Sequence, residues 1–257
     1  MGKGLISSRD LREGMQHLDV APDLRLINGR CAMLMRSRTL LLGDLHLGIE
    51  ASLELEGMQL PRAQAREMRR RIDEVVSAHH PKRIVVLGDL KHEFSRNLDQ
   101  EWSQVREMLE HLGSLAELTV VRGNHDNYLA TITSRLGLEL VDQAVIDGVH
   151  LSHGHLTEPG RPLVQGHEHP SARLFDGVGG YVKLPAFLYH PQAEVLVLPA
   201  FSPLAAGNDV STLLAGDVLS PGLREVDMGE ALVFGCSDIG LIRLGKVRDQ
   251  SKGRRRA

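Results

Sequence analysis

The stretch that decides the fold is Thr39-Leu40-Leu41-Leu42-Gly43-Asp44-Leu45-His46, an apolar run that stops at a glycine and leads into two residues able to bind metal. Similar runs at 83–87, 118–121 and 149–151 also halt at or near such residues. Short runs rich in Val, Ile and Leu that end this way are typical of buried strands leading into functional loops. With a fifth segment, the clusters are Gly43-Asp44-Leu45-His46, Gly88-Asp89-Leu90-Lys91-His92, Gly123-Asn124-His125-Asp126, His153-Gly154-His155 and Gly166-His167-Glu168-His169.

Two amphipathic helices are expected between the first three strands, with Pro61 in the first turn of one of them. Their apolar stripes are Met68, Ile72, Val75 and Val76 in the first helix and Leu98, Trp102, Val105, Leu109 and Leu112 in the second. The alternation of strand and helix places the polar clusters at the carboxyl ends of strands. Ligand sites of α/β sheets are built at these ends.

The pattern changes after residue 166, because no strong helix follows. Runs at 182–188, 194–198, 231–234 and 239–244 are typical of strands separated by turns. We therefore expect an α/β fold in which a second sheet packs on the first and helices flank the pair. A single domain is predicted over residues 1–245, followed by a basic tail without regular structure over 246–257.

Composition excludes several classes of protein. The chain has 257 residues, 42% hydrophobic and 25% charged, as in ordinary soluble proteins. A net charge of -3 exerts no global attraction on nucleic acids or acidic membranes, and 4% aromatic residues leave no base-stacking platform. Cys31 and Cys236 form no metal motif and are expected to be reduced. With no apolar run of membrane-spanning length and no signal-peptide pattern, we expect a cytoplasmic protein without a membrane partner.

The clusters hold seven of the thirteen histidines. Asp, Asn and His offer oxygen and nitrogen ligands that suit borderline and harder divalent metals. In an extended segment, Asp44 and His46 would point the same way and reach one metal. The carboxylate of Asp89 could bridge two metals about 3.5–4 Å apart. His125, oriented by Asp126, is a plausible general acid. Each cluster alone could equally be a polar turn or a group of surface histidines.

The order of all five clusters resembles that of the calcineurin-like metallophosphoesterases, over residues 40–170. Four segments are more narrowly similar to the ICC-like phosphoesterases of archaea and bacteria, a group that includes the DNA-ligase-associated phosphoesterases and so suggests DNA repair. The resemblance implies a four-layer αββα sandwich of two packed mixed β-sheets flanked by helices. It also implies two divalent metal ions, Mn first, with Fe, Zn or Ni compatible. The four segments are 43–48, 87–92, 122–128 and 200–204.

The resemblance also assigns roles to residues of this chain. The first metal would take Asp44, His46, Asp89 and His169, and the second would take Asp89, Asn124, His153 and His167. His125, oriented by Asp126, would be catalytic. His92 would contact the substrate phosphate, whereas His155 would touch substrate or only support His153.

These roles lead us to expect a metal-dependent phosphoesterase that hydrolyses phosphodiester bonds by in-line attack of a metal-bridging hydroxide. DNA or RNA is one candidate substrate. The alternatives are a phosphomonoesterase acting on a small metabolite or nucleotide and, in a different class, a non-catalytic scaffold of the same fold. The segment around Asp89 lacks the Gly-Asp-x-Val-Asp-Arg-Gly pattern of protein Ser/Thr phosphatases, which argues against that branch of the family. Because few residues remain outside the resemblance, we do not expect the added DNA-binding domain of the nuclease branch, and processive degradation of duplexes is not expected. The oligomeric state stays open.

Overall fold

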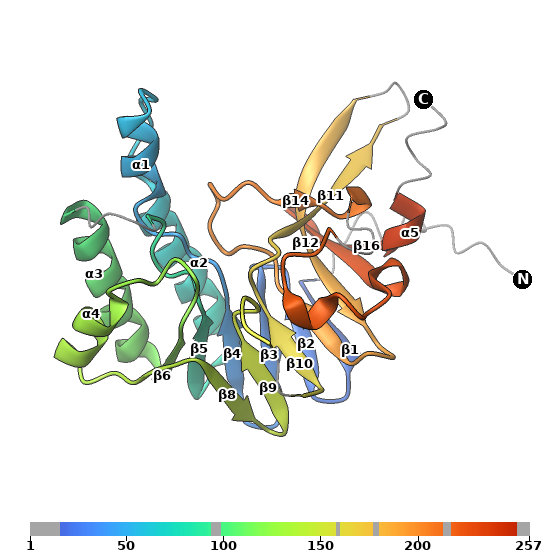
Figure 1. The fold of residues 1–257 in the computed structure, drawn as a ribbon, viewed down its shortest axis with the longest axis horizontal. Coiled ribbons are helices and arrows are strands. Elements are labelled where there is room, and N and C mark those ends of the chain that lie inside the picture. Colours follow the sequence, from blue (N-terminus) through green and yellow to red (C-terminus); the bar gives the residue numbers. More distant parts are fainter. Residues whose placement is uncertain (1–15, 94–98, 158–159, 177–179, 213–216, 251–257) are drawn as a thin grey trace, which may run out of the picture.

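The computed structural model describes residues 16–93, 99–157, 160–176, 180–212 and 217–250. Within these ranges the strands form two mixed sheets that pack against each other; helices cover the outer face of the first sheet, and short helical turns cover that of the second. Figure 1 shows helices α1 to α4 gathered on one side of the molecule, with β11, β12 and β16 on the other. This is the predicted arrangement of two packed sheets flanked by helices.

The first sheet has the order β1-β2-β3-β4-β5-β6-β7. Strands β1 to β4 are antiparallel hairpin neighbours, whereas β4 to β7 run parallel. The parallel half therefore brings the carboxyl ends of β4, β5 and β6 to one edge. The bounds are β1 His17–Ala21, β2 Leu24–Ile27, β3 Cys31–Leu34, β4 Thr39–Leu42, β5 Arg83–Leu87, β6 Glu117–Val121 and β7 Leu140–Val141.

Helices α1 (Ile49–Leu55), α2 (Gln64–His79), α3 (Asp99–Leu115) and α4 (Leu129–Arg135) follow strands of this first sheet. Alternate residues of β4 face opposite ways, as the pleat of a strand requires. Leu40 and Leu42 pack with Met68 and Ile72 of α2, while Leu41 belongs to the cluster between the sheets. The outer helices therefore cover one face of the first sheet, and the second sheet packs against the other face.

The second sheet has the order β14-β11-β12-β13-β10-β9-β8, and β15 joins it by pairing with β12 and β16. Strands β9, β10 and β13 are parallel to one another. Its bounds are β8 Gln143–Ile146, β9 Val149–Ser152, β10 Leu163–Gln165, β11 Pro170–Phe175, β12 Tyr181–His190, β13 Val195–Val197, β14 Asn208–Asp209, β15 Leu232–Ser237 and β16 Gly240–Lys246.

The outer layer on the second sheet is thin. It consists of the 3-10 helices η1 (Val210–Thr212), η2 (Pro221–Leu223) and η3 (Met228–Glu230) and of α5 (Val247–Gln250). Val210, Leu223, Met228 and Val247 are buried in this third cluster against strand residues. Short turns thus take the place of the long helices that cover the first sheet.

Several expectations need correction in detail. Pro61 lies before α2 rather than in its first turn, because the helix begins at Gln64. Regular structure also continues beyond residue 245: Lys246 closes β16 and residues 247–250 form α5. Leu98, the N-terminal segment and the tail residues 251–257 lie outside the described residues. In the described part of the chain, no helix combines the length and apolar character needed to cross a membrane.

Candidate metal centre

The five polar clusters meet where the two sheets present the carboxyl ends of their parallel strands. Asp44 follows β4, Asp89 follows β5 and Asn124 follows β6. From the second sheet, His153 follows β9 and His167 follows β10. Two layers that are distant in sequence thus contribute side chains to one centre.

The backbone at this centre is unusual, because several candidate ligands have positive φ. The φ angles are 58° for Asp44, 46° for His46, 48° for Asp89, 70° for His167 and 44° for His169. This left-handed region is sparsely populated by residues other than glycine, and such outliers concentrate at functional sites. It also corrects the expectation of extended pairs, because Asp44 and His46 meet through turns of the backbone and not through strand alternation.

Two glycines allow the clusters to approach one another. A Cβ at Gly88, whose φ is +78°, would lie 2.5 Å from Nδ1 of His153. A Cβ at Gly123 would lie 2.2 Å from both the backbone nitrogen and Oδ1 of Asp89. Neither position has room for a side chain, so the two glycines of these motifs are required by close packing.

The first group of side chains comprises Asp44, His46, Asp89 and His169, whose potential ligand atoms all lie within 4.8 Å of one another. Nε2 of His169 is 3.2 Å from Oδ1 of Asp44 and 3.1 Å from Nε2 of His46. Nε2 of His46 is 3.8 Å from Oδ2 of Asp89. These are the four residues expected to hold the first metal.

The second group comprises Asp89, His153 and His167, again within 4.8 Å. Nε2 of His153 is 3.4 Å from Oδ2 of Asp89, 3.0 Å from Nδ1 of His167 and 3.0 Å from Oδ1 of Asn124. The structure therefore brings all four residues expected at the second metal to one point. Asp89 is common to both groups.

The donor atoms fit a cation in their midst. Ligand atoms about 2.0–2.2 Å from one metal, at tetrahedral to octahedral angles, are about 2.8–3.6 Å apart. Most contacts in the two groups fall in this range. His153 gives a sharper indication, because its Nδ1 donates to the carbonyl of Leu87 at 3.0 Å. Its Nε2 therefore points into the second group, where it faces the oxygens of Asn124 and Asp89 and Nδ1 of His167. Nε2 of His153 is thus the ring atom available to a cation at this position.

The pKa shifts of the candidate ligands favour the deprotonated forms that bind metal, with one exception. Burial lowers the pKa of His46 well below its usual value, and burial with the neighbouring His153 lowers the pKa of His167 to about 4. Burial alone would raise the pKa of Asp44, but the facing histidines outweigh it and lower the pKa. The exception is His169: burial opposes its protonation, yet pairing with Asp44 raises its pKa.

The expected pair of His125 and Asp126 is not formed. Nδ1 of His125 donates instead to the backbone carbonyl of His92, at 2.5 Å. The carboxylate of Asp126 accepts the backbone N–H groups of Gly123, Leu90 and Lys91, at 2.8, 2.9 and 3.3 Å. Asp126 is 2% exposed, and burial followed by the charge of Asp89 raises its pKa to about 6. Asp126 ties two site loops together and does not orient the histidine ring.

The two histidines assigned to substrate lie at the border of the centre. The ring of His92 stacks near that of His125, with centroids 6.1 Å apart, and meets His46 edge-on at 5.4 Å. The ring of His155 lies 5.3 Å from that of His153. Neither belongs to the two ligand groups. His92 is thus placed beside the first group and His155 beside the second.

Sequence reasoning missed the buried polar residues behind the ligands. Gln64 of α2 donates from Nε2 to the carbonyls of Leu45 and His46, at 3.2 and 3.0 Å, and to Oγ of Ser202 at 2.8 Å. Glu168 accepts the N–H groups of residues 219 and 220. Gln64 falls four residues before Met68 and so continues the apolar stripe of α2. The sequence offered one signal of this role, a polar residue at a position of the apolar helix stripe.

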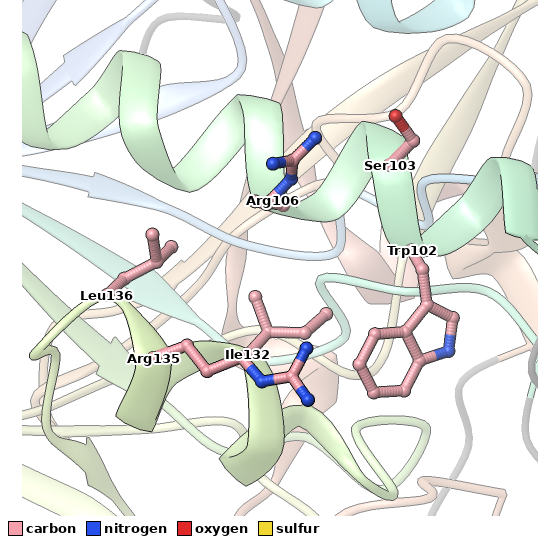
Figure 2. A pocket seen from close by; sticks show the side chains of 6 residues that line it. All are labelled: Trp102, Ser103, Arg106, Ile132, Arg135 and Leu136. Atoms are coloured by element: carbon pink, nitrogen blue, oxygen red, sulfur yellow. The ribbon is translucent and has the colours of Figure 1, made fainter.

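Two cavities differ in their position relative to the candidate metal centre. One of about 320 Å³ lies between α3 and α4, lined by Trp102, Ile132 and Arg135 among others (Figure 2), and includes none of the predicted site residues. A second, also about 320 Å³, borders His169 and is lined by Arg30, Lys183 and Leu204 among others. Only the second adjoins the candidate metal centre.

Comparison with known proteins agrees with the geometry. A family model described as calcineurin-like phosphoesterase matches residues 37–221. Among solved structures, the nuclease MPE of Pseudomonas putida has a TM-score of 0.65 at 20% identity, covering 89% of this chain and 99% of that chain. The phosphoesterase Yfce from E. coli has a TM-score of 0.40 at 18% identity, covering 82% and 94%. No curated protein sequence matches this chain.

Because the family model covers most of the chain, the protein belongs to the calcineurin-like phosphoesterases. It is a metal-dependent phosphoesterase, a hydrolase with the two-sheet fold described above.

Proposed function

We propose that the protein is a dinuclear metal-dependent phosphodiesterase, with nucleic acid as a substrate class. The observation that carries this proposal is the convergence of seven side chains into two groups that share Asp89. Two divalent ions fit this set, Mn²⁺ first, because mixed imidazole, amide and carboxylate ligands suit borderline metals. A scaffold that had lost catalysis would not need to keep both groups of ligands.

When bound, such ions polarise phosphate oxygens and supply a nucleophilic water at neutral pH. The residues of the chain complete the site. Asp89 belongs to both groups and so links them. Its Oδ1 also accepts the backbone N–H of His125 at 2.9 Å. His125 is thereby fixed beside the first group, with its ring centroid 5.3 Å from that of His46.

His125 is the residue best placed to assist the leaving oxygen. Its Nδ1 must carry a proton, since the carbonyl of His92 can only accept. Its Nε2 is then the atom that takes up or releases a proton during reaction. A histidine used in this way typically contributes about 10²–10⁴-fold to the rate.

The groove beside His169 favours a diester over a monoester. A diester carries a second organic group on phosphorus, and that group needs space next to the centre. The groove of about 320 Å³ offers Arg30 and Lys183 together with the apolar side chains of Pro203 and Leu204. Cationic and apolar surfaces side by side suit the phosphates and sugars or bases of a nucleic-acid strand.

The test is hydrolysis of bis-p-nitrophenyl phosphate by metal-stripped protein before and after adding Mn²⁺, with p-nitrophenyl phosphate in parallel. We expect Mn-dependent cleavage of the diester in excess of the monoester. Asp89→Asn is the matched control and should lose metal and activity together. Faster cleavage of the monoester would replace the proposal by a phosphomonoesterase, and two bound metals without turnover of either ester would refute both.

A further inference from the structure

Glu101 is a buried carboxylate that the proposed reaction has not yet used. It lies in the first turn of α3, is 1% exposed, and directs its side chain at the loop that follows β5. Its Oε1 accepts the backbone N–H of Glu93 at 2.7 Å and that of His92 at 3.0 Å. Two amide donors on one carboxylate oxygen form charge-assisted hydrogen bonds, which are stronger than neutral ones.

The hydrogen bond from Glu93 connects Glu101 to His125. The N–H of Glu93 and the carbonyl of His92 belong to the same peptide group, whose other end accepts Nδ1–H of His125. An anion at the N–H end of a peptide polarises its carbonyl and strengthens that carbonyl as an acceptor. Glu101 is therefore connected to His125 through one peptide group.

The first motif of the chain makes room for this arrangement. Gly48 has φ +88°, and a Cβ there would lie 2.8 Å from Cβ and 2.9 Å from Cγ of Glu101. The N–H of His92 is shared between Glu101 and the carbonyl of Leu47, which accepts it at 2.9 Å. The backbone at Gly48 and the backbone at His92 thus both lie against the side chain of Glu101.

The charge of Glu101 is balanced locally. Lys91, which is 3% exposed, places Nζ 3.9 Å from Oε2 of Glu101 and also donates to the backbone carbonyl of Glu93. A buried carboxylate is costly unless it is paired and hydrogen-bonded. Oε1 of Glu101 is hydrogen-bonded to two backbone N–H groups, and Oε2 faces the ammonium of Lys91 but accepts no hydrogen bond among the described residues. The carboxylate is thus directed at the loop that follows β5 and is not a solvated helix end.

We propose that Glu101 is a positioning residue for His125, acting through the peptide group between His92 and Glu93. It holds the proton on Nδ1 of His125 and so presents Nε2 to the leaving oxygen. This inference rests on the proposed function, since it assigns Glu101 to the same reaction. It takes over the role that the neighbouring Asp126 was expected to fill.

The kinetic test compares Glu101→Gln with wild type on two diesters. Gln keeps an oxygen acceptor but removes the charge. Because nitrophenolate leaves easily, bis-p-nitrophenyl phosphate needs little protonation, whereas diphenyl phosphate has a poorer leaving group. We expect kcat to fall about tenfold on diphenyl phosphate, which is a part of the about 10²–10⁴-fold that acid–base assistance typically contributes. The change on the nitrophenyl ester should be smaller, and KM should be unchanged. The bound metal content should stay at the wild-type level.

A double-mutant cycle separates positioning from general damage. In a His125→Ala background, Glu101→Gln should have no further effect. Glu50→Gln is the matched control, because Glu50 is equally buried and also accepts two backbone N–H groups, from Ala63 and Gln64. Its effect should persist in the His125→Ala background. An effect of Glu101→Gln that also persists there would overturn the proposal.

A readout independent of turnover distinguishes failure of this inference from failure of the proposed function. In histidine-labelled protein, the Nδ1 proton of His125, assigned by its absence in His125→Ala, should resonate downfield in NMR spectra. It should move upfield in Glu101→Gln. The pair Lys91→Met and Glu101→Gln together avoids leaving a buried ammonium unpaired and should show the same shift. An unmoved resonance in the folded variants would refute the relay, whatever the substrate.

Discussion

Gln64→Leu removes the side chain that fixes the backbone of the first metal-ligand cluster. Gln64 is 2% exposed, and its Nε2 contacts the carbonyls of Leu45 and His46 and the hydroxyl of Ser202. Leu is close in volume, so the change removes hydrogen bonds with little change in packing. We expect a loss of both stability and metal affinity.

The magnitude follows from the contacts. One amide NH₂ has two hydrogens, so the three acceptors share two hydrogen bonds, each with a net value of about 1–1.5 kcal/mol. The free energy of unfolding should fall by about 2–3 kcal/mol. At about 2–4 °C per kcal/mol for a chain of this size, the melting temperature should fall by about 4–12 °C. Loss of support behind a metal ligand typically lowers metal affinity about 10–100-fold.

Thermal denaturation and Mn²⁺ titration measure these two effects. Gln143→Leu is the control, because Gln143 makes a single exposed hydrogen bond to the carbonyl of Thr157. Its effect on stability should stay within about 0.5 kcal/mol. If Gln64→Leu melted at the wild-type temperature and bound Mn²⁺ with wild-type affinity, the support assigned to Gln64 would be wrong.

Three further outcomes are expected. His125→Ala should lower kcat about 10²–10⁴-fold while metal analysis shows both ions retained; loss of metal would place it among the ligands. Asp44 raises the pKa of His169 despite its burial, whereas burial lowers the pKa of His167 to about 4. His169 therefore takes up a proton at a higher pH than His167. Metal should therefore leave the first group before the second as pH falls below neutral, as metal analysis after dialysis would show; simultaneous release would contradict this. Gly123→Ala should abolish folding, because its Cβ would lie 2.2 Å from a backbone atom. Gly113→Ala is the control: a Cβ there has nothing within 4 Å, and it should stabilise helix α3 by about 0.5–1 kcal/mol in thermal melts. Equal melting temperatures of the two variants would refute the predicted steric clash at Gly123.

The strands that lead into the site could be predicted because their signals are local. The runs at 39–42 and 83–87 coincide with β4 and β5, and the run at 118–121 misses only the first residue of β6. Each is almost entirely apolar because it is covered on both faces, and each ends in the polar cluster that it positions. Pattern and structure agree here because one physical cause, burial in the centre of the sheet, sets both.

Helices α1 and α4 escaped prediction because their starts lack the usual signals. The residue before α1 is Gly48, and the residue before α4 is Tyr128 with φ 67°. Neither helix has a side-chain cap on its first turn, and each is only seven residues long. Tertiary packing, such as the burial of Leu129 and Ile132, holds α4 in place.

The proximity of the candidate metal ligands could be expected from the sequence, but the buried residues that support them could not. Asp126 adjoins His125 in sequence, yet backbone N–H groups from the loop after β5 occupy its carboxylate. That loop is brought to Asp126 only by the sheet. Conversely, Glu101 and Gln64 each stand four residues before an apolar stripe residue, Val105 and Met68, and are buried on that stripe. Polar residues at such positions indicate buried hydrogen bonding, although not its partners.

The most direct test of the central claim is electron paramagnetic resonance of the Mn²⁺-loaded protein. Two Mn²⁺ ions bridged by Asp89 at about 3.5–4 Å should be magnetically coupled and give a multiline spectrum at two ions per chain. Asp89→Asn should lose this signal, with fewer ions bound. A wild-type spectrum of isolated Mn²⁺ at one ion per chain, unchanged in Asp89→Asn, would contradict a dinuclear centre.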